Sequence, residues 1–145
     1  MNGGAVMPER PQVLIVDDEP NMRRVLVALL EREPCEVLEA VDGIEALRIM
    51  DDNVVHMAIA DLRMPRMDGM ELLRRVVARD PDLPVIVLTA HGTVDTAVEA
   101  MKLGAFDFIT KPFERSEMLA VVRKALRAVR LDGAAAAPPA EGESR

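Results

Sequence analysis

The sequence predicts a single α/β domain built on a parallel β-sheet that carries helices on both faces. Short apolar runs rich in β-branched residues alternate five times with stretches whose apolar residues recur at helical spacing. The connections are short, and a length of 145 residues suits one domain with a real core. Such alternation favours a parallel sheet, because right-handed crossovers place the helices on its two faces.

The first two strand–helix pairs lie in the first third of the chain. A strand at 13–16 stops at two aspartates, and a helix follows with Pro20 at its first position. The run 35–40 alternates like a less buried, edge-like strand, and the pair Asp42 and Glu45 has the spacing of a capping box that opens the next helix. Buried stripes are expected at Met22, Val25, Leu26 and Leu29 in the first helix, and at Ile44, Leu47 and Met50 in the second.

Three further pairs complete the expected domain. Strands are expected at 54–60, 84–88 and 105–110, followed by Asp61, Thr89 and Lys111 respectively. A second capping box opens the third helix, Gly104 closes the fourth, and the fifth runs to about Leu131. Their buried stripes are expected at Met70, Leu73, Val76 and Val77, at Val94, Ala97, Val98 and Met101, and at Leu119, Val122, Leu126 and Val129. Residues 11–131 thus form the domain, 1–10 a flexible extension, and the Ala/Pro-rich stretch 132–145 a flexible linker or tail.

Composition and charge exclude several classes of protein. A net charge of −7 argues against direct nucleic-acid binding by this chain. A single cysteine, Cys35, excludes an internal disulfide and makes a cysteine-based zinc site a poor candidate. No apolar run approaches the roughly 20 residues of a membrane span, and the N-terminus lacks the pattern of a signal peptide. A cytoplasmic protein is expected.

The residues that follow the predicted strands carry the chemistry. Asp17 and Asp18 follow the first strand, Asp61 the third, Thr89 the fourth and Lys111 the fifth. Polar residues often begin where buried strands stop, which explains any one of them. The carboxyl ends of parallel strands share one rim, where ligands of such sheets bind, so all five together indicate a site.

This set of side chains suits Mg²⁺-dependent phosphoryl transfer. Three neighbouring carboxylates repel one another unless positive charge intervenes; Lys111 offers one charge, and Mg²⁺, which prefers oxygen ligands, offers two. The chain has no glycine-rich phosphate loop and no serine placed as a nucleophile. An aspartate can itself be the nucleophile and form an acyl phosphate, and Asp61, alone at the end of a central strand, is the candidate.

Four motifs in this order resemble the receiver domain of response regulators in bacterial two-component signalling, over about Pro11 to Leu131. They are V-D-D-E from Val16, D-L-R-M-P-R-M-D-G from Asp61, L-T-A-H-G from Leu88 and F-D-F-I-T-K-P-F from Phe106. The resemblance implies a flavodoxin-like (βα)5 fold with strand order 2-1-3-4-5. It also implies that a sensor histidine kinase phosphorylates the domain.

The same resemblance implies a role for each site residue. Asp61 is the phosphoacceptor and, with Asp18, a direct Mg²⁺ ligand; Asp17 acts largely through a bound water, and the backbone carbonyl of Arg63 completes the protein's ligands. Thr89 hydrogen-bonds the phosphoryl group and Lys111 pairs with it. The remaining implied roles are a cis bond at Lys111-Pro112, a switch formed by Thr89 and Phe108, and control of phosphate lifetime by Arg63 and His91.

The resemblance extends to the output. The motifs are most similar to receivers of transcriptional activators that act with the alternative sigma factor, and receivers joined to helix-turn-helix outputs look similar. The output surface, and a phosphorylation-dependent homodimer, would use the fourth helix, fifth strand and fifth helix. Slow autodephosphorylation is expected, without turnover on a free metabolite.

Three alternatives stay open from the sequence. An aspartate-nucleophile phosphatase would carry D-x-D after its first strand, where this chain has D-D-E. A flavodoxin-like cofactor binder would need aromatic residues to stack a flavin, and the chain has no Trp, no Tyr and three Phe. A degenerate receiver would bind partners without being phosphorylated.

Overall fold

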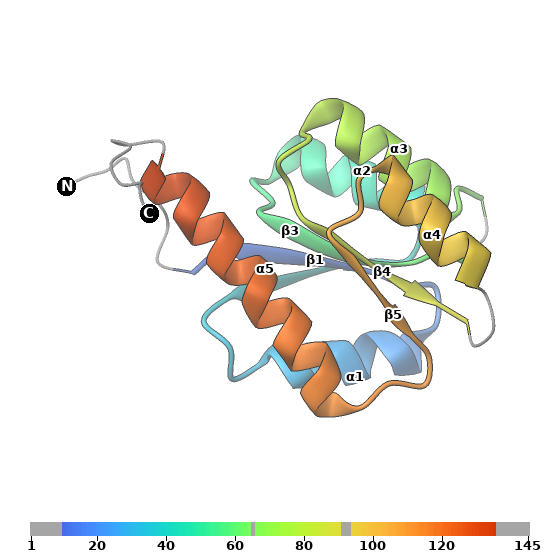
Figure 1. Ribbon diagram of the computed structural model, residues 1–145, viewed down its shortest axis with the longest axis horizontal. Helices are drawn as coiled ribbons and strands as arrows, with labels where there is room; N and C mark the ends of the chain where they lie inside the picture. Colours follow the sequence, from blue (N-terminus) through green and yellow to red (C-terminus); the bar gives the residue numbers. More distant parts are fainter. Residues whose placement is uncertain (1–9, 65, 91–93, 136–145) are drawn as a thin grey trace.

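A computed structural model describes residues 10–64, 66–90 and 94–135, with side chains described as far as Val129 except that of Val94. Five parallel strands lie in the order β2-β1-β3-β4-β5, which confirms the predicted fold and topology (Figure 1). The strands are β1 (Gln12–Val16), β2 (Glu36–Ala40), β3 (Met57–Asp61), β4 (Val85–Thr89) and β5 (Asp107–Thr110). The helices are α1 (Pro20–Leu30), α2 (Gly43–Asp52), α3 (Gly69–Arg79), α4 (Val94–Leu103) and α5 (Arg115–Ala135).

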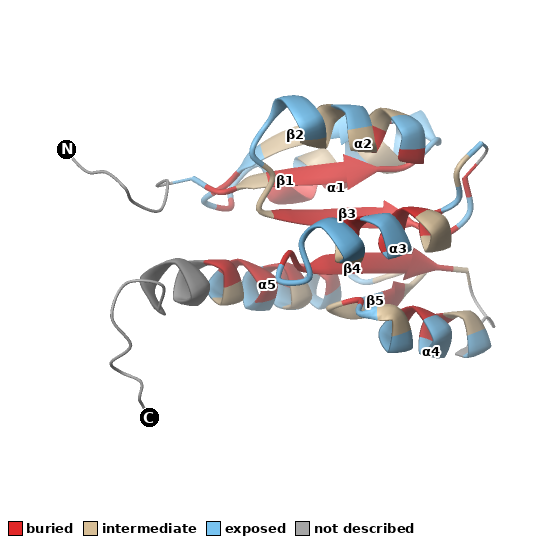
Figure 2. Cartoon of the chain, turned by 90° about the horizontal axis from the view of Figure 1, so that it is seen from above, coloured by how far each residue is buried: buried red, intermediate tan, exposed pale blue. Residues whose placement is uncertain are grey.

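Two hydrophobic cores lie on opposite faces of the sheet. Helices α1 and α5 cover one face, and α2, α3 and α4 cover the other (Figure 1). Alternate residues of β1 belong to different cores, Val13 and Ile15 to the first and Leu14 and Val16 to the second. Because both faces are covered, β1, β3 and β4 are buried along almost their whole length (Figure 2).

The predicted helix starts are confirmed. Asp42 caps α2 by accepting a hydrogen bond from the Glu45 amide at 2.9 Å, and Asp68 caps α3 by accepting one from the Glu71 amide at 2.9 Å. Pro20 begins α1, where its missing N–H costs no helical hydrogen bond. Within the described residues, every helix is too short or too polar to span a bilayer.

Some residues of the predicted buried stripes are exposed. The α5 stripe is buried as predicted, but α1, α2 and α4 bury a narrower stripe than expected. Helical spacing fixes the direction of a side chain but not the width of the packed face. In α1, for example, the buried residues are Leu26, Leu29 and Leu30. The predicted third strand begins later, at Met57, which leaves Val54 in the preceding loop with 66% of its surface exposed. The exposed members of the predicted stripes are Val25, Ile44, Val98 and Met101.

Helix α5 is longer than predicted. It ends at Ala135 rather than near Leu131. Alanine is the strongest helix former, and the residues after Gly133 are alanines, so the helix continues through this glycine into the low-complexity stretch. Residues 136–145 lie outside the described part of the chain.

Candidate functional site

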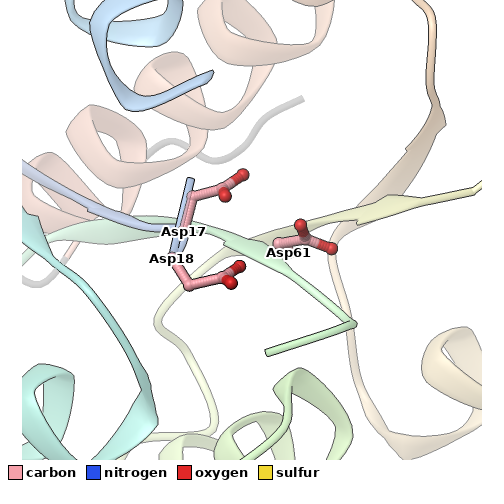
Figure 3. Close-up of side chains that lie close together, drawn as sticks. All are labelled: Asp17, Asp18 and Asp61. Atoms are coloured by element: carbon pink, nitrogen blue, oxygen red, sulfur yellow. The ribbon is translucent and has the colours of Figure 1, made fainter. Parts of the chain in front are cut away.

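The three aspartates predicted at the strand ends lie together. One carboxylate oxygen from each of Asp17, Asp18 and Asp61 lies within 4.8 Å of the other two. Figure 3 shows that Asp17 and Asp18 follow β1 and that Asp61 ends the neighbouring strand β3. The parallel register pairs Val16 with Ala60, so the next residues along the two strands lie at the same level of the rim.

Lys111 reaches this cluster from the end of β5. Its Nζ donates a hydrogen bond to Asp61 Oδ2 at 2.7 Å and lies 3.7 Å from Asp17 Oδ2. Its backbone amide bonds to the Thr89 carbonyl at 2.8 Å, and the bond to Pro112 is cis. Burial alone would lower the pKa of Lys111, but the hydrogen bond and the charge of Asp61 raise it overall. Lys111 is therefore an ammonium, and one positive charge faces three carboxylates.

Asp17 is the carboxylate that most needs a further cation. Its side chain is 0% exposed, and its Oδ1 accepts the Glu19 amide at 2.9 Å. Among the described residues, no hydrogen-bond donor reaches its Oδ2. Burial raises the pKa of Asp17, and the charges of Asp61 and Asp18 raise it further against the Glu19 hydrogen bond. A buried carboxylate oxygen with no donor is costly, and a hard divalent cation would neutralise it, so these residues fit Mg²⁺.

The space beside the acceptor is lined by two more of the predicted residues. The Arg63 amide donates to Asp61 Oδ1 at 2.9 Å, while the Arg63 side chain is exposed. The side chain of Thr89 is buried at the end of β4. A cavity of about 80 Å³ is lined by Leu62, Arg63, Thr89, Ala90 and Thr96.

Of the two remaining predicted residues, one lies at the surface and the other lies outside the described part of the chain. Phe108 is 41% exposed on the edge strand β5 and so does not belong to either core. His91 lies outside the described residues.

Two residues of the site were not predicted from the sequence. Gly69, the first residue of α3, packs directly against the backbone at the end of β3. A Cβ on Gly69 would collide with the Asp61 carbonyl oxygen and lie 2.6 Å from the Leu62 Cα. Arg23 Nη1 donates to the backbone carbonyl of Asp17 at 2.7 Å and so holds the β1–α1 loop. The Asp-Gly pair at 68–69 could have indicated that a glycine is required there, whereas helical spacing does not distinguish Arg23 from the other residues of its helix.

The solved structures that resemble this chain include receiver domains. A response regulator receiver domain protein from Clostridium thermocellum is 35% identical, with a TM-score of 0.78, over 83% of this chain and 98% of that one. NtrX from Brucella abortus, solved in complex with ADP, is 32% identical with a TM-score of 0.82, over 93% of this chain but 31% of NtrX.

The curated relatives are longer transcriptional regulators. The C4-dicarboxylate transport transcriptional regulatory protein DctD of Pseudomonas aeruginosa is 40% identical over 131 residues, which are 90% of this chain and 28% of DctD. This chain therefore spans about a quarter of the length of such relatives. The family described as the response regulator receiver domain matches residues 13–123. With its fold, its cluster of aspartates and this match, the chain belongs to the response regulator receiver domain family.

Proposed function

We propose that this chain is the phosphoacceptor of a two-component pathway and that Asp61 takes its phosphoryl group from a phosphohistidine of a sensor histidine kinase. The observation that carries the proposal is the surroundings of Asp61: Lys111 Nζ at 2.7 Å on one side and the carboxylates of Asp17 and Asp18 on the other. An Asp61 carboxylate oxygen attacks phosphorus, the bond from phosphorus to the imidazole nitrogen breaks, and its electron pair leaves with the histidine.

The residues around Asp61 have separate tasks in this transfer. Asp18, Asp61 and the Arg63 carbonyl would hold Mg²⁺ directly and Asp17 largely through a bound water, and the metal would supply positive charge to neutralise the oxygens of the transferring group. Lys111 pairs with one phosphoryl oxygen, and the Thr89 hydroxyl donates a hydrogen bond to another. Arg63 lines a cavity together with Thr89, which supports assigning control of the acyl phosphate lifetime to Arg63, and by the same resemblance to His91.

Phosphorylation would change the surface made by α4, β5 and α5. Thr89 moves toward the phosphoryl oxygens, and Phe108 turns inward from its exposed position. Val98, Met101 and Phe108 are exposed apolar residues on α4 and β5, which suits a surface that pairs with a second copy.

We further propose a transcriptional output that lies outside this chain. We infer that the chain itself does not bind nucleic acid and that the output belongs to a longer protein, because this chain matches only 28% of the transcriptional regulatory protein DctD. An activator acting with the alternative sigma factor is the output that the motifs favour.

Incubation with acetyl phosphate and Mg²⁺, followed by intact-mass measurement, tests the proposal. The wild type should gain one phosphoryl group, the gain should require Mg²⁺, and Asp61→Asn should abolish it. Asp68→Asn is the matched control, because it makes the same change in the same loop and keeps an oxygen that can cap α3. An unmodified wild type that also fails to respond to beryllofluoride would instead indicate a binding module that works without phosphorylation.

A further inference from the structure

The loop that follows the acceptor strand contains a residue in an unfavourable conformation. Arg66 has φ of 66°, in the left-handed region that favours glycine and costs free energy for other residues. Such a conformation persists only where the surroundings hold it, and it is often found beside functional sites.

The surroundings that hold Arg66 are at the start of α2. Arg66 Nε donates to Asp42 Oδ2 at 2.7 Å, and Nη2 donates to the same oxygen. The Asp42 side chain is only 4% exposed, and its Oδ1 caps α2 through the Glu45 amide. Burial would raise the pKa of Asp42, but the Glu45 hydrogen bond and the Arg66 guanidinium lower it overall. Asp42 is therefore a buried carboxylate whose charge is matched by Arg66.

A second contact lies beside this ion pair. A Cβ on Gly43 would lie 2.8 Å from Met67 Cγ, which shows how closely the Met67 side chain lies against the α2 N-terminus. Two consecutive loop residues thus contact the N-cap and the first residue of α2, Arg66 through Asp42 and Met67 through Gly43.

The same loop carries the residue proposed to complete the metal site. At its base, the Gly69 amide bonds to the Leu62 carbonyl at 3.1 Å, and the Arg63 amide bonds to Asp61 Oδ1 at 2.9 Å. These two bonds lie beside Asp61, and the Arg66–Asp42 pair lies three residues after Arg63 in the same loop.

We propose that the Arg66–Asp42 ion pair is a latch that holds this loop in its metal-binding conformation and so sets the affinity for Mg²⁺. Arg66 is then a positioning residue that acts through the Arg63 carbonyl. This inference rests on the proposed function, because it assigns a partner to the same metal site.

The size of the effect follows from the fraction of molecules whose loop is correctly placed. When the latch is lost, the apparent affinity falls in proportion to that fraction. Partners that orient metal ligands are typically worth about 10- to 100-fold in affinity. Because Arg66 is 58% exposed and acts on a single carbonyl, we expect an effect at or below the lower end of this range, about 3- to 10-fold, for Arg66→Ala.

The test is a Mg²⁺ titration followed by ¹H–¹⁵N NMR, because the chain has no Trp or Tyr to report by fluorescence. Arg66→Ala and Asp42→Asn should each raise the Kd, and the double variant should raise it no more than either alone. Arg66→Lys should restore part of the affinity. Arg79→Ala is the matched control, because it also removes an arginine that pairs with an aspartate at an end of α2, here Asp51 at 2.6 Å, but from the C-terminal end of α3, remote from the site.

Two further measurements separate positioning from a general loss of stability. In the absence of Mg²⁺, the amide hydrogens of Arg63 and Gly69 should exchange faster in Arg66→Ala but not in Arg79→Ala. The rate of phosphorylation by acetyl phosphate should stay within about twofold of the wild type at saturating Mg²⁺, while the Mg²⁺ concentration needed for half the rate rises.

The outcomes distinguish the two proposals. A wild type that binds no Mg²⁺ overturns both the metal site and the latch. A wild type that binds Mg²⁺, with Arg66→Ala and Asp42→Asn binding it equally well, overturns the latch alone. Additive effects of the two substitutions would also overturn it, because two residues that act as one pair cannot be lost twice.

Discussion

In the absence of Mg²⁺, Asp17→Asn is expected to make the protein more stable at pH 7. Asp17 is a fully buried carboxylate, and no donor among the described residues reaches its Oδ2. The substitution removes the charge and preserves the shape. It also keeps an oxygen that can accept the Glu19 amide, which now bonds to Oδ1 at 2.9 Å.

The magnitude follows from two opposing contributions. A buried polar group with no partner costs about 1–3 kcal/mol, and more when it is charged. The loss of the Lys111 ammonium at 3.7 Å opposes the gain, but Lys111 keeps its closer partner Asp61 at 2.7 Å. We expect a net gain of about 1–2 kcal/mol, or roughly 3–6 °C in Tm for a domain of this size.

The gain should depend on pH with a definite sign. Burial raises the pKa of Asp17, so the folded state favours its protonated form. The stability that Asp17 contributes is fully present below its unfolded pKa near 3.8 and is lost as pH rises through the higher folded pKa. The two proteins should therefore be similar at low pH, and the variant should become the more stable one as pH approaches neutrality.

Thermal unfolding followed by far-UV circular dichroism measures these effects in EDTA and in Mg²⁺. Saturation at 100 times Kd stabilises the wild type by about 2.7 kcal/mol, and a variant that has lost a ligand gains less, so Mg²⁺ should reverse the order. Asp18→Asn is the matched control, because Asp18 is exposed and its loss relieves only repulsion. An Asp17→Asn protein no more stable than the wild type in EDTA at pH 7 would refute the reasoning.

Three further predictions follow from other contacts. Lys111→Ala should slow phosphorylation of Asp61 about 100-fold or more and leave Mg²⁺ binding intact, as followed by intact mass over time; an unchanged rate would contradict the role of the ammonium. Gly69→Ala should cost about 3 kcal/mol in urea unfolding, because its Cβ would collide with the Asp61 carbonyl; a neutral result would mean that the backbone yields there. Glu33→Gln should lower Tm at pH 7, and this loss should shrink as pH falls below 4.5. The hydrogen bonds from Arg123, at 3.0 Å, lower the pKa of Glu33, so the stability that Glu33 contributes is present above its unfolded pKa of 4.5 and is lost as pH falls through the lower folded pKa. A loss of the same size at every pH would contradict this.

The sequence was sufficient to predict the rim because the topology of a parallel sheet leaves little choice. Once five strands alternate with helices, their carboxyl ends share one edge, and Asp17, Asp61 and Lys111 must gather there wherever each strand stops. The burial of individual helix residues was less predictable. Val98 and Met101 have the spacing of a core stripe, yet both are exposed, because periodicity does not say how wide a face the neighbouring elements cover.

The Arg66–Asp42 pair was beyond sequence reasoning for a different reason. The chain has 18 basic and 25 acidic residues, so charge alone permits far too many pairings to select one between residues 24 positions apart. The left-handed backbone conformation of Arg66 is one that usually requires glycine, so the sequence gives no reason to expect it at an arginine. The position of the acidic cluster follows from the order of the strands. The conformation of the loop beside it is locally unfavourable at Arg66 and depends on a long-range ion pair. Through the Arg66–Asp42 pair, the start of α2 would then set the affinity of the site for Mg²⁺, although α2 contributes no ligand.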